Sequence, residues 1–397
     1  MKFLRQFSFV ILVVSACSSG VFADEIDSLK NVIAKLPDDS NKVNTLNELS
    51  KQLLNTDPKQ TIEYATKAAN LAHKIGYIKG EAYAYKFIGI SQFNSGDNLE
   101  TLKTWQHSLD LFKSISFKKG IANLLSNIGN IYYNQGDEEN ALVYFYQSLK
   151  IAEEIKDTVR LSTVYINIGS MYSNRPFDYD KAIKYYKLAM GLSIATHDDY
   201  ILGNNEMNLG EVYYKQGKID TALNYFISAV TILKGTDGYS YALNSLANAY
   251  MAKKDFDKAI LYHQQAYDDA KKLDGNLDMA TSLRGMGEVY LEQKKYSNSR
   301  AALLSAEGYA LKVNGVNELK EIYKLLVQVS AGSNDYKSGF VYQQKLMDIK
   351  DTIYSIDKDK KLGSLQFEFD IQKQKGQIDL LQKDQELNEH KIQQQKN

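Results

Sequence analysis

Apolar residues recur at helical spacing in two neighbouring stretches of residues 121–160. In the first stretch, Leu124, Ile128 and Ile131 fall at positions i, i+4 and i+7, which is one face of a helix. The pair Gly136-Asp137 then supplies a glycine that can end one helix and an aspartate that can cap the next. The second stretch again carries apolar or small residues on one face: Ala141, Phe145, Ser148 and Ala152. The segment therefore predicts two helices joined by a tight turn.

The same pattern returns along the chain with a period of about 40 residues. One slot inside each first helix holds a glycine or, once, an alanine: Gly89, Gly129, Gly169, Gly210, Ala247 and Gly287. A tyrosine follows three residues later in most units, and an alanine follows twelve or thirteen residues after the slot. Because glycine costs about 1 kcal/mol in a helix interior, its return at one slot predicts that neighbouring helices approach closely there.

This arrangement resembles the tetratricopeptide repeat (TPR), a helix–turn–helix unit that stacks into an α-solenoid. The matching features are the Gly-x-x-Tyr motif, the alanine after it, a later aromatic residue and a small residue beyond that, as in Phe145, Tyr186, Phe226, Ala189, Ala229 and Ala266. The period exceeds the roughly 34 residues of the common repeat, so the chain is more similar to the longer repeats of kinesin light chain and LGN-type adaptors. The resemblance implies an all-α solenoid of about eight units.

Residues 1–23 are typical of an export signal. Two basic residues precede the apolar run Phe7–Val14, which is too short to span a bilayer. Two processing sites remain open. Residues 21–23 (Val-Phe-Ala) resemble a signal peptidase I site, whereas the sequence ending at Cys17 resembles a lipobox, in which Cys17 would become a lipidated N-terminus. Either one predicts an exported protein of the periplasm or cell envelope, without a disulfide because Cys17 is the only cysteine.

The remaining chain divides into three predicted segments. Residues 24–41 form a short amphipathic helix that caps the first unit, because the outer face of a terminal repeat has no neighbour. Residues 42–361 form the TPR solenoid. Residues 362–397 are rich in Gln, Lys, Glu and Asp, with apolar heptad positions at Phe367, Ile371, Ile378, Leu381 and Ile392. This tail predicts either a two-stranded coiled coil that makes a homodimer or a single solvated helix.

Composition excludes several classes of function. The 48 basic and 48 acidic residues give a net charge of zero, so there is no electrostatic case for nucleic acid or an anionic membrane surface. The five histidines are scattered, and no HExxH motif, zinc spacing or catalytic pair occurs. We therefore expect no cofactor, no metal and no enzymatic activity. His263 stands where other units have Phe or Tyr, and the phosphate-loop-like stretch Gly285–Gly287 lies on a repeat helix, so packing explains both.

Asparagines line one face of several first helices. Asn123, Asn127, Asn130 and Asn134 lie at i, i+4, i+7 and i+11, and neighbouring units repeat the feature at Asn167, Asn174, Asn204, Asn208, Asn244 and Asn248. Asn is a mediocre helix former, so a helix face rich in it predicts binding. The TPR resemblance implies that first helices line a concave groove, where such carboxamides hold the backbone of an extended peptide. A merely hydrated surface is the alternative.

Further polar and aromatic side chains fall near the same face. We expect these residues to add selectivity to the groove: Tyr133, Tyr214, Tyr241, Glu211, Arg284 and Glu288.

The predicted function is a non-catalytic scaffold that binds a protein or peptide in the bacterial cell envelope. The order of export signal, TPR units and coiled coil also resembles the extracytoplasmic half of bacterial TPR sensor kinases and membrane-bound regulators. The alternative is therefore the sensory region of such a protein, in which a membrane span and an output domain follow the coiled coil. Membrane attachment is expected only through a lipid anchor at Cys17 or through a downstream span.

Overall fold

The computed structural model describes the backbone of residues 19–54 and 56–396, and the side chains of residues 25–54 and 56–373. This part of the chain holds α-helices and one short 3-10 helix, without a strand. The helices are α1 Ser19–Lys35, α2 Ser40–Leu53, α3 Pro58–Lys74, α4 Ile78–Asn94, α5 Asn98–Ser114, α6 Lys118–Asn134, α7 Glu138–Glu154, α8 Thr158–Ser173, η1 Pro176–Asp178, α9 Tyr179–Thr196, α10 Asp199–Lys215, α11 Ile219–Ile232, α12 Tyr239–Ala252, α13 Phe256–Lys272, α14 Asn276–Glu292, α15 Tyr296–Lys312, α16 Val316–Gly332 and α17 Tyr336–Lys396.

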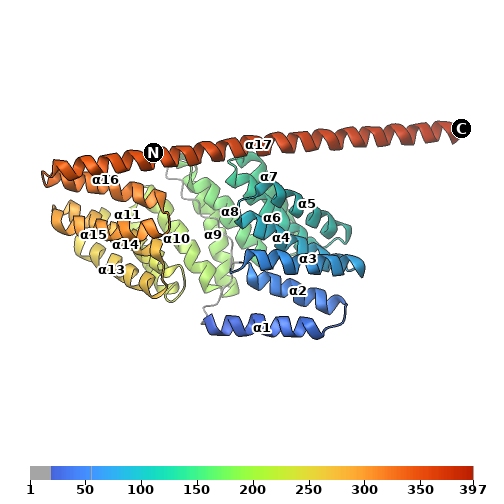
Figure 1. Cartoon of the computed structure of the whole chain (residues 1–397), viewed down its shortest axis with the longest axis horizontal. Helices are drawn as coiled ribbons and strands as arrows, with labels where there is room; N and C mark the ends of the chain where they lie inside the picture. Colours follow the sequence, from blue (N-terminus) through green and yellow to red (C-terminus); the bar gives the residue numbers. More distant parts are fainter. Residues whose placement is uncertain (1–18, 55, 397) are drawn as a thin grey trace.

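Helices α2 to α17 form eight antiparallel pairs, each made of an even-numbered first helix and an odd-numbered second helix. Figure 1 shows the stack turning from α2–α7 on the right of the view to α13–α16 on the left. Helix α1 lies against α2, with Ile33 packed beside Val43. The predicted all-α solenoid of about eight units is confirmed. Cys17, the candidate lipidation site, lies outside the described residues.

Left-handed turn residues end the helices. Gly96, Gly136 and Gly217 have φ angles of 85°, 81° and 75°, the conformation that glycine adopts without steric cost. The aspartates that follow the first two cap the next helix: the side chain of Asp97 accepts from the Glu100 amide, and that of Asp137 accepts from the Asn140 amide. The cap at Asp137 is the one that the Gly136-Asp137 pair predicted, and Asp97 repeats it in the preceding unit.

Where the slot of a first helix holds glycine, it faces a large side chain of the second helix. A Cβ added at Gly129 would lie 2.7 Å from Cε1 of Phe145 and 3.2 Å from the Ala141 carbonyl oxygen. The same contact recurs between Gly169 and Tyr186, and between Gly210 and Phe226. No side chain fits in these places, so the predicted reason for the recurring glycine, close helix packing, is confirmed.

Stacked tyrosines form a second repeated contact within the pairs. One ring comes from the Gly-x-x-Tyr motif of the first helix and the other from the second helix. Their centroids lie 5.3 to 6.0 Å apart, and their planes lie within 9° to 11° of parallel: Tyr132 with Tyr144, Tyr172 with Tyr185, Tyr213 with Tyr225, and Tyr250 with Tyr262. Offset stacks of this kind contribute about 0.5–1.5 kcal/mol each beyond the area that they bury. The high tyrosine content of the chain therefore reflects packing.

First helices of successive pairs also contact one another directly, at every step except that from α4 to α6, whereas second helices lack contacts of similar extent. A stack that packs more closely on one side curves toward that side. The first helices therefore form the inner surface of the solenoid, which we call the inner face.

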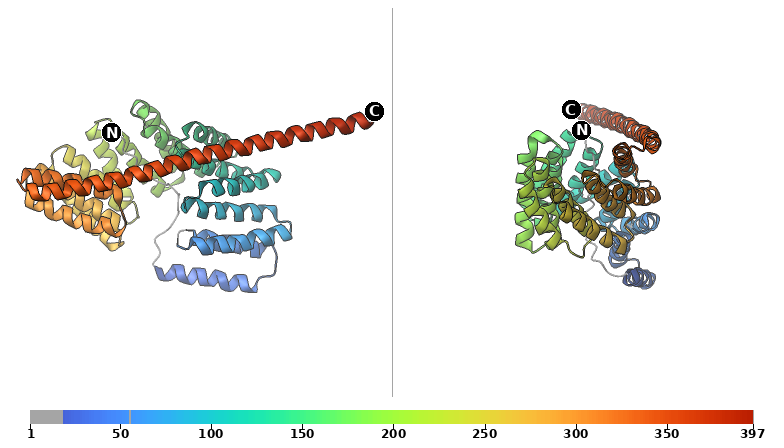
Figure 2. Two further views of the ribbon diagram at one scale, coloured as in Figure 1. Left: turned by 45° about the horizontal axis from the view of Figure 1, so that its top comes forward. Right: turned by 90° about the vertical axis from the view of Figure 1, so that its left-hand side faces the viewer.

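Helix α17 continues past the last pair and returns to the third one. It packs on α16 through Leu346 and then crosses to α6, where the Phe367 ring meets Tyr132 at a centroid distance of 5.9 Å. The Ser364 hydroxyl donates to Oε1 of Gln135 at 2.7 Å. Figures 1 and 2 show α17 spanning the two sides of the solenoid and extending beyond α5.

This return changes the interpretation of the tail. The coiled-coil pattern placed Phe367 and Ile371 in a seam between two chains. In the structure, Phe367 is buried and Ile371 is half-buried against the core around α6 of the same chain. The helix is also unbroken from Tyr336 to Lys396, so it shows no boundary at residue 361. The seam positions beyond residue 373 lie outside the described side chains.

Two glycine-to-alanine changes should have opposite effects on stability. Gly129→Ala should lower the free energy of unfolding by about 1–3 kcal/mol, because its Cβ would overlap the fully buried Phe145 ring. Gly191→Ala in α9 should raise it by up to about 1 kcal/mol, because no atom lies within 4 Å of the added Cβ and alanine favours the helix. Urea unfolding followed by circular dichroism measures both. Equal effects would contradict the packing role of the slot.

Candidate functional site

The predicted asparagines lie on four successive first helices, α6, α8, α10 and α12, but their environments differ. Asn244 is buried and fully engaged. Its Nδ2 donates to Oγ of Ser282 at 2.9 Å, and its Oδ1 lies 2.8 Å from Nδ1 of His263. Asn123 is also buried, and its Oδ1 has no hydrogen-bond partner. Neither carboxamide is available to a ligand on the inner face. These two residues therefore do not belong among the asparagines that could bind a peptide.

Three more asparagines form hydrogen bonds inside the solenoid. Asn167 donates to Oγ of Ser126 at 3.3 Å, and Asn174 donates to the Tyr133 hydroxyl at 2.7 Å. Both bonds join α8 to α6. Asn204 donates at 2.8 Å to the carbonyl of Tyr200, one turn earlier in its own helix. These carboxamides link first helices or cap a local carbonyl, and each keeps its oxygen as a free acceptor.

The remaining predicted asparagines are open. Asn127, Asn130 and Asn248 are half-buried and Asn134 is exposed, and none of the four bonds to another described residue. Asn208 is half-buried, and its Nδ2 is shielded from solvent without an acceptor. Asn127 and Asn208 occupy the same place, two residues before the glycine slot, in helices α6 and α10. The part of the asparagine set that is free to bind therefore lies along three first helices.

Sequence reasoning missed Asn205, which is fully buried in α10. Its Nδ2 lies 3.4 Å from Oγ of Ser193, and its Oδ1 has no partner. Asn205 follows Asn204 directly in the sequence. Only the spacing of the apolar residues in α10 could have predicted that Asn205 faces the core while Asn204 does not.

The other predicted residues form a charged cluster toward the C-terminal end of the inner face. Nε of Arg284 donates to Oε1 of Glu318 on the next first helix at 2.5 Å, and its Nη1 lies 3.7 Å from Oε2 of Glu288. Burial raises the pKa of Glu288. It also raises the pKa of Tyr214, and the nearby Glu288 carboxylate adds to that shift. The cluster therefore brings α10, α14 and α16 together.

A further contact of this kind joins α12 to α10. The Tyr241 hydroxyl donates to the Glu211 carboxylate. Both residues of this pair were predicted to face the groove, and the structure brings them together there.

The N-terminal end of the inner face carries the opposite charge, which the sequence analysis did not identify. Lys86 on α4 and Arg160 on α8 are half-buried, and no carboxylate among the described residues lies within ion-pair distance of either side chain. Nε of Arg160 is shielded from solvent and has no acceptor. Burial, together with the charges of Arg160 and Lys51, lowers the pKa of Lys86 to about 7. This end of the face is short of negative charge.

The tetratricopeptide-repeat family model matches five overlapping segments: residues 80–154, 120–195, 160–235, 200–272 and 238–308. Together they span residues 80–308, which is more than half of the 397 residues. The chain belongs to the tetratricopeptide-repeat family. The resemblance that the sequence motifs indicated is therefore confirmed. No curated protein sequence matches the chain.

Solved structures show the same fold at low sequence identity. The apo form of the quorum sensor NprR from B. thuringiensis is 16% identical, with a TM-score of 0.60 over 83% of this chain and 97% of that one. A STAND protein with a TPR sensor from Pyrococcus horikoshii is 13% identical, with a TM-score of 0.61; the match covers 88% of this chain but only 55% of that one. A Rap protein complexed with competence and sporulation factor is 16% identical, with a TM-score of 0.50 over 85% and 99%.

His263 is a core residue of this TPR array. It occupies the sequence position of Phe226 in the preceding pair, but its ring faces the first helix of the next pair, α14, where Gly285 makes room for it: a Cβ at Gly285 would lie 2.2 Å from Cε1 of the ring. The neutral ring donates from Nδ1 to Asn244, while Nε2 is buried without a partner. Gly285 therefore serves helix packing, as the sequence analysis predicted, and accommodates a ring that replaces phenylalanine.

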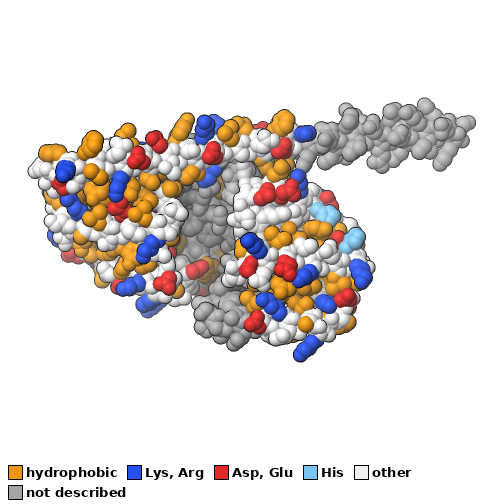
Figure 3. Space-filling view, in the orientation of Figure 1, with side chains coloured by type: hydrophobic (Ala, Val, Ile, Leu, Met, Phe, Trp, Pro, Cys, Tyr) orange, Lys and Arg blue, Asp and Glu red, His pale blue; other side chains and the backbone are white. Residues whose placement is uncertain are grey.

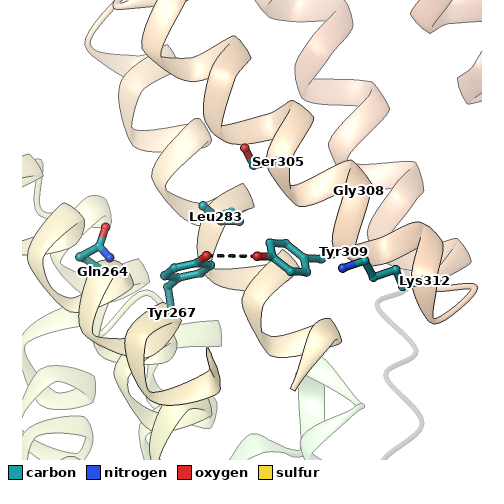
Figure 4. A pocket seen from close by; sticks show the side chains of 7 residues that line it. All are labelled: Gln264, Tyr267, Leu283, Ser305, Gly308, Tyr309 and Lys312. Atoms are coloured by element: carbon teal, nitrogen blue, oxygen red, sulfur yellow. Dashed lines mark hydrogen bonds between the residues drawn. The ribbon is translucent and has the colours of Figure 1, made fainter. Parts of the chain in front are cut away.

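A shallow cavity of about 390 Å³ lies between the second helices α13 and α15 (Figure 4). The hydroxyls of Tyr267 and Tyr309 meet across it at 3.2 Å, and Leu283 forms its floor. The Lys312 ammonium lies 4.9 Å from the centre of the Tyr309 ring.

Among the described residues, no group of three or more His, Cys, Asp and Glu side chains is placed to hold a metal ion. No described helix combines the length and apolar character that a membrane span requires.

Acid should destabilise this protein partly through His263. Burial lowers the folded-state pKa of His263 from 6.5 to about 3, so the unfolded chain takes up the proton first. The neutral His263 ring therefore contributes fully to the free energy of unfolding above pH 6.5, and this contribution is lost as the pH falls toward 3. Between pH 7 and pH 4.5 the wild type should lose roughly 2 kcal/mol more unfolding free energy than His263→Phe. Urea unfolding at several pH values tests this, and parallel pH profiles of the two proteins would contradict it.

Proposed function

We propose that this TPR protein is a non-catalytic scaffold that holds an extended peptide or protein segment on its inner face. The observation that carries the proposal is the set of half-buried carboxamides without partners at Asn127, Asn130, Asn208 and Asn248. Among these amides, the Nδ2 of Asn208 is shielded from solvent without an acceptor, which is costly; the other three are open to a ligand. A bound peptide backbone supplies both the acceptors and the donors that such amides lack.

The charges flanking these carboxamides define the ligand further. Lys86 and Arg160 lie at the N-terminal end of the inner face without a carboxylate partner, and Lys86 also contacts the rings of Tyr83 and Phe87 at 5.8 and 5.6 Å. An acidic side chain would satisfy both cations. At the other end, Glu288 and Glu318 already compensate Arg284. The proposed ligand is therefore a peptide with at least one acidic residue at the end that lies over α4 to α8.

Two similar structures support a binding role. The Rap protein with this fold was solved in a complex with competence and sporulation factor, and NprR is named a quorum sensor. The resemblance to the extracytoplasmic half of TPR sensor kinases stays a prediction, and a sensory role would use the same inner face.

Replacing the four half-buried open asparagines together should abolish most peptide binding. Peptides would be selected from a random dodecapeptide library against the wild type, and we expect acidic residues among those enriched. The change Asn127→Ala, Asn130→Ala, Asn208→Ala, Asn248→Ala should weaken their binding by roughly 100-fold, since each lost hydrogen bond contributes about 0.5–1.5 kcal/mol. Helicity should not fall, because alanine is the better helix former. Isothermal titration calorimetry and circular dichroism measure the two quantities.

The matched control is Asn224→Ala with Asn298→Ala, two exposed asparagines on the second helices α11 and α15. This variant should bind the selected peptides as the wild type does. If the quadruple variant also binds normally, or if no peptide is enriched, the inner-face proposal fails.

We also propose that the protein acts in the cell envelope, after export directed by residues 1–23. The mature N-terminus decides between the two processing sites. Mass spectrometry of the protein isolated from producing cells should find either a chain that begins at Asp24 or one that begins at a lipid-modified Cys17. A chain that retains residues 1–16 would contradict export.

A further inference from the structure

Helix α17 has two apolar faces, of which the solenoid uses one. The inward face carries Tyr342, Leu346, Ile349, Phe367 and Ile371, which are buried or half-buried against α16 and α6. The opposite face carries large apolar side chains that are between 51% and 75% exposed: Phe340, Met347, Tyr354, Leu362, Leu365 and Phe369. We call this second set the outer stripe. Figure 3 shows hydrophobic side chains along the upper edge of the molecule, where α17 lies.

The outer stripe is one continuous surface. At about 100° per residue, its six residues fall within an arc of roughly 80° of a straight helix, and they extend over roughly 44 Å. Two charged residues, Asp351 and Lys358, fall within the same arc. Soluble proteins rarely expose contiguous apolar surface on this scale unless something binds there.

The stripe is also symmetric about its centre, the peptide bond between Tyr354 and Ser355. Phe340 lies fourteen residues before Tyr354, and Phe369 lies fourteen after Ser355. Met347 and Leu362 lie seven residues from the centre on either side. An antiparallel copy of the helix, related by a twofold axis at this point, would therefore place each phenylalanine on the other and each methionine on a leucine.

The charges follow the same symmetry with opposite signs. Asp351 lies three residues before Tyr354, and Lys358 lies three after Ser355. The antiparallel arrangement forms two Asp351–Lys358 pairs between the chains. A parallel arrangement in register would instead put Asp351 against Asp351 and Lys358 against Lys358, which is repulsive.

We infer that two copies of this chain associate through the outer stripe of α17, antiparallel and twofold symmetric about Tyr354–Ser355. An isologous interface requires that residue i contacts residue j while j contacts i. The outer stripe has this property at Phe340 with Phe369, Met347 with Leu362 and Asp351 with Lys358, whereas Leu365 falls against Gln344 of the copy. An unrelated protein partner would not require such symmetry. The six apolar side chains supply roughly 600 Å² per chain, and the flanking polar residues bring the total near the about 800 Å² per partner of a standard stable interface.

The inference is independent of the proposed function. The outer stripe lies on the side of α17 that faces away from α6 and α16, so a dimer leaves the inner face of each solenoid unobstructed by this contact. It also differs from the coiled coil expected over residues 362–397, whose Phe367 and Ile371 face the solenoid.

Sedimentation equilibrium of the full chain should show a concentration-dependent dimer. Phe340→Glu with Phe369→Glu should raise its dissociation constant by roughly 30-fold or more, because each change removes an aromatic contact between the chains and places two carboxylates against each other at both ends of the interface. Leu273→Glu is the matched control, because Leu273 is an apolar residue 62% exposed at the end of α13, and its dissociation constant should not change. A chain that remains monomeric at concentrations on the order of 100 µM overturns the inference.

Charge exchange tests the pairing. Asp351→Lys alone and Lys358→Asp alone should each weaken the dimer, because each places like charges against each other. The double exchange should restore it, because it rebuilds both Asp–Lys pairs between the chains. Failure of the double exchange to restore the dimer overturns the proposed register.

Disulfide cross-linking tests the direction in a Cys17→Ser background, which has no other cysteine. Tyr354→Cys should cross-link to its own copy at the axis. Phe340→Cys alone should not, because the two copies lie roughly 44 Å apart, whereas Phe340→Cys with Phe369→Cys should. Cross-linking by Phe340→Cys alone would indicate a parallel dimer and overturn the antiparallel one.

Discussion

The structure depends on the contact between a glycine slot of the first helix and an aromatic side chain of the second. Gly129 against Phe145 brings the two helix backbones closer than any side chain at that slot allows. Because the contact recurs at Gly169 and Gly210, these pairs have nearly the same shape, and similar units stack into a regular curve. In four of the pairs, stacked tyrosines also join the first helix to the second. The shape of the inner face therefore follows from the packing between the first and second helices.

The repeat made most of this predictable from the sequence. A sequence pattern that recurs in several units can be recognised even where one unit departs from it. The helix pairs, the glycine slot and the glycine turns could therefore be predicted. Turns without glycine were harder: His197 and Lys254 adopt left-handed φ angles of 54° and 61°. Their conformation follows from the stacking of the helices on either side, and local propensity does not encode that.

The candidate site was less predictable for a related reason. A carboxamide on a first helix can serve a ligand or the neighbouring helix, and sequence spacing is the same in both cases. Asn244 bonds to Ser282 and His263 because the ring at position 263 offers a donor where phenylalanine offers none. Asn127 has no such neighbour. The distinction between the two asparagines therefore depends on one residue in another helix. The cationic end of the inner face also depends on two helices, because Arg160 of α8 adds its charge to that of Lys86 on α4.

Helix α17 extends the same reasoning beyond the repeats. A helix with a single apolar stripe could pack on α16 or form a seam with another chain, but it could not do both. In α17, Leu346 and Phe367 face the solenoid, while Phe340 and Phe369 face away from it. Because the contact at Phe367 and Tyr132 joins the third pair to the last, it restricts changes in curvature between them. The curvature sets the width of the inner face, so the helix that bears the outer stripe is also the element that constrains the proposed binding surface.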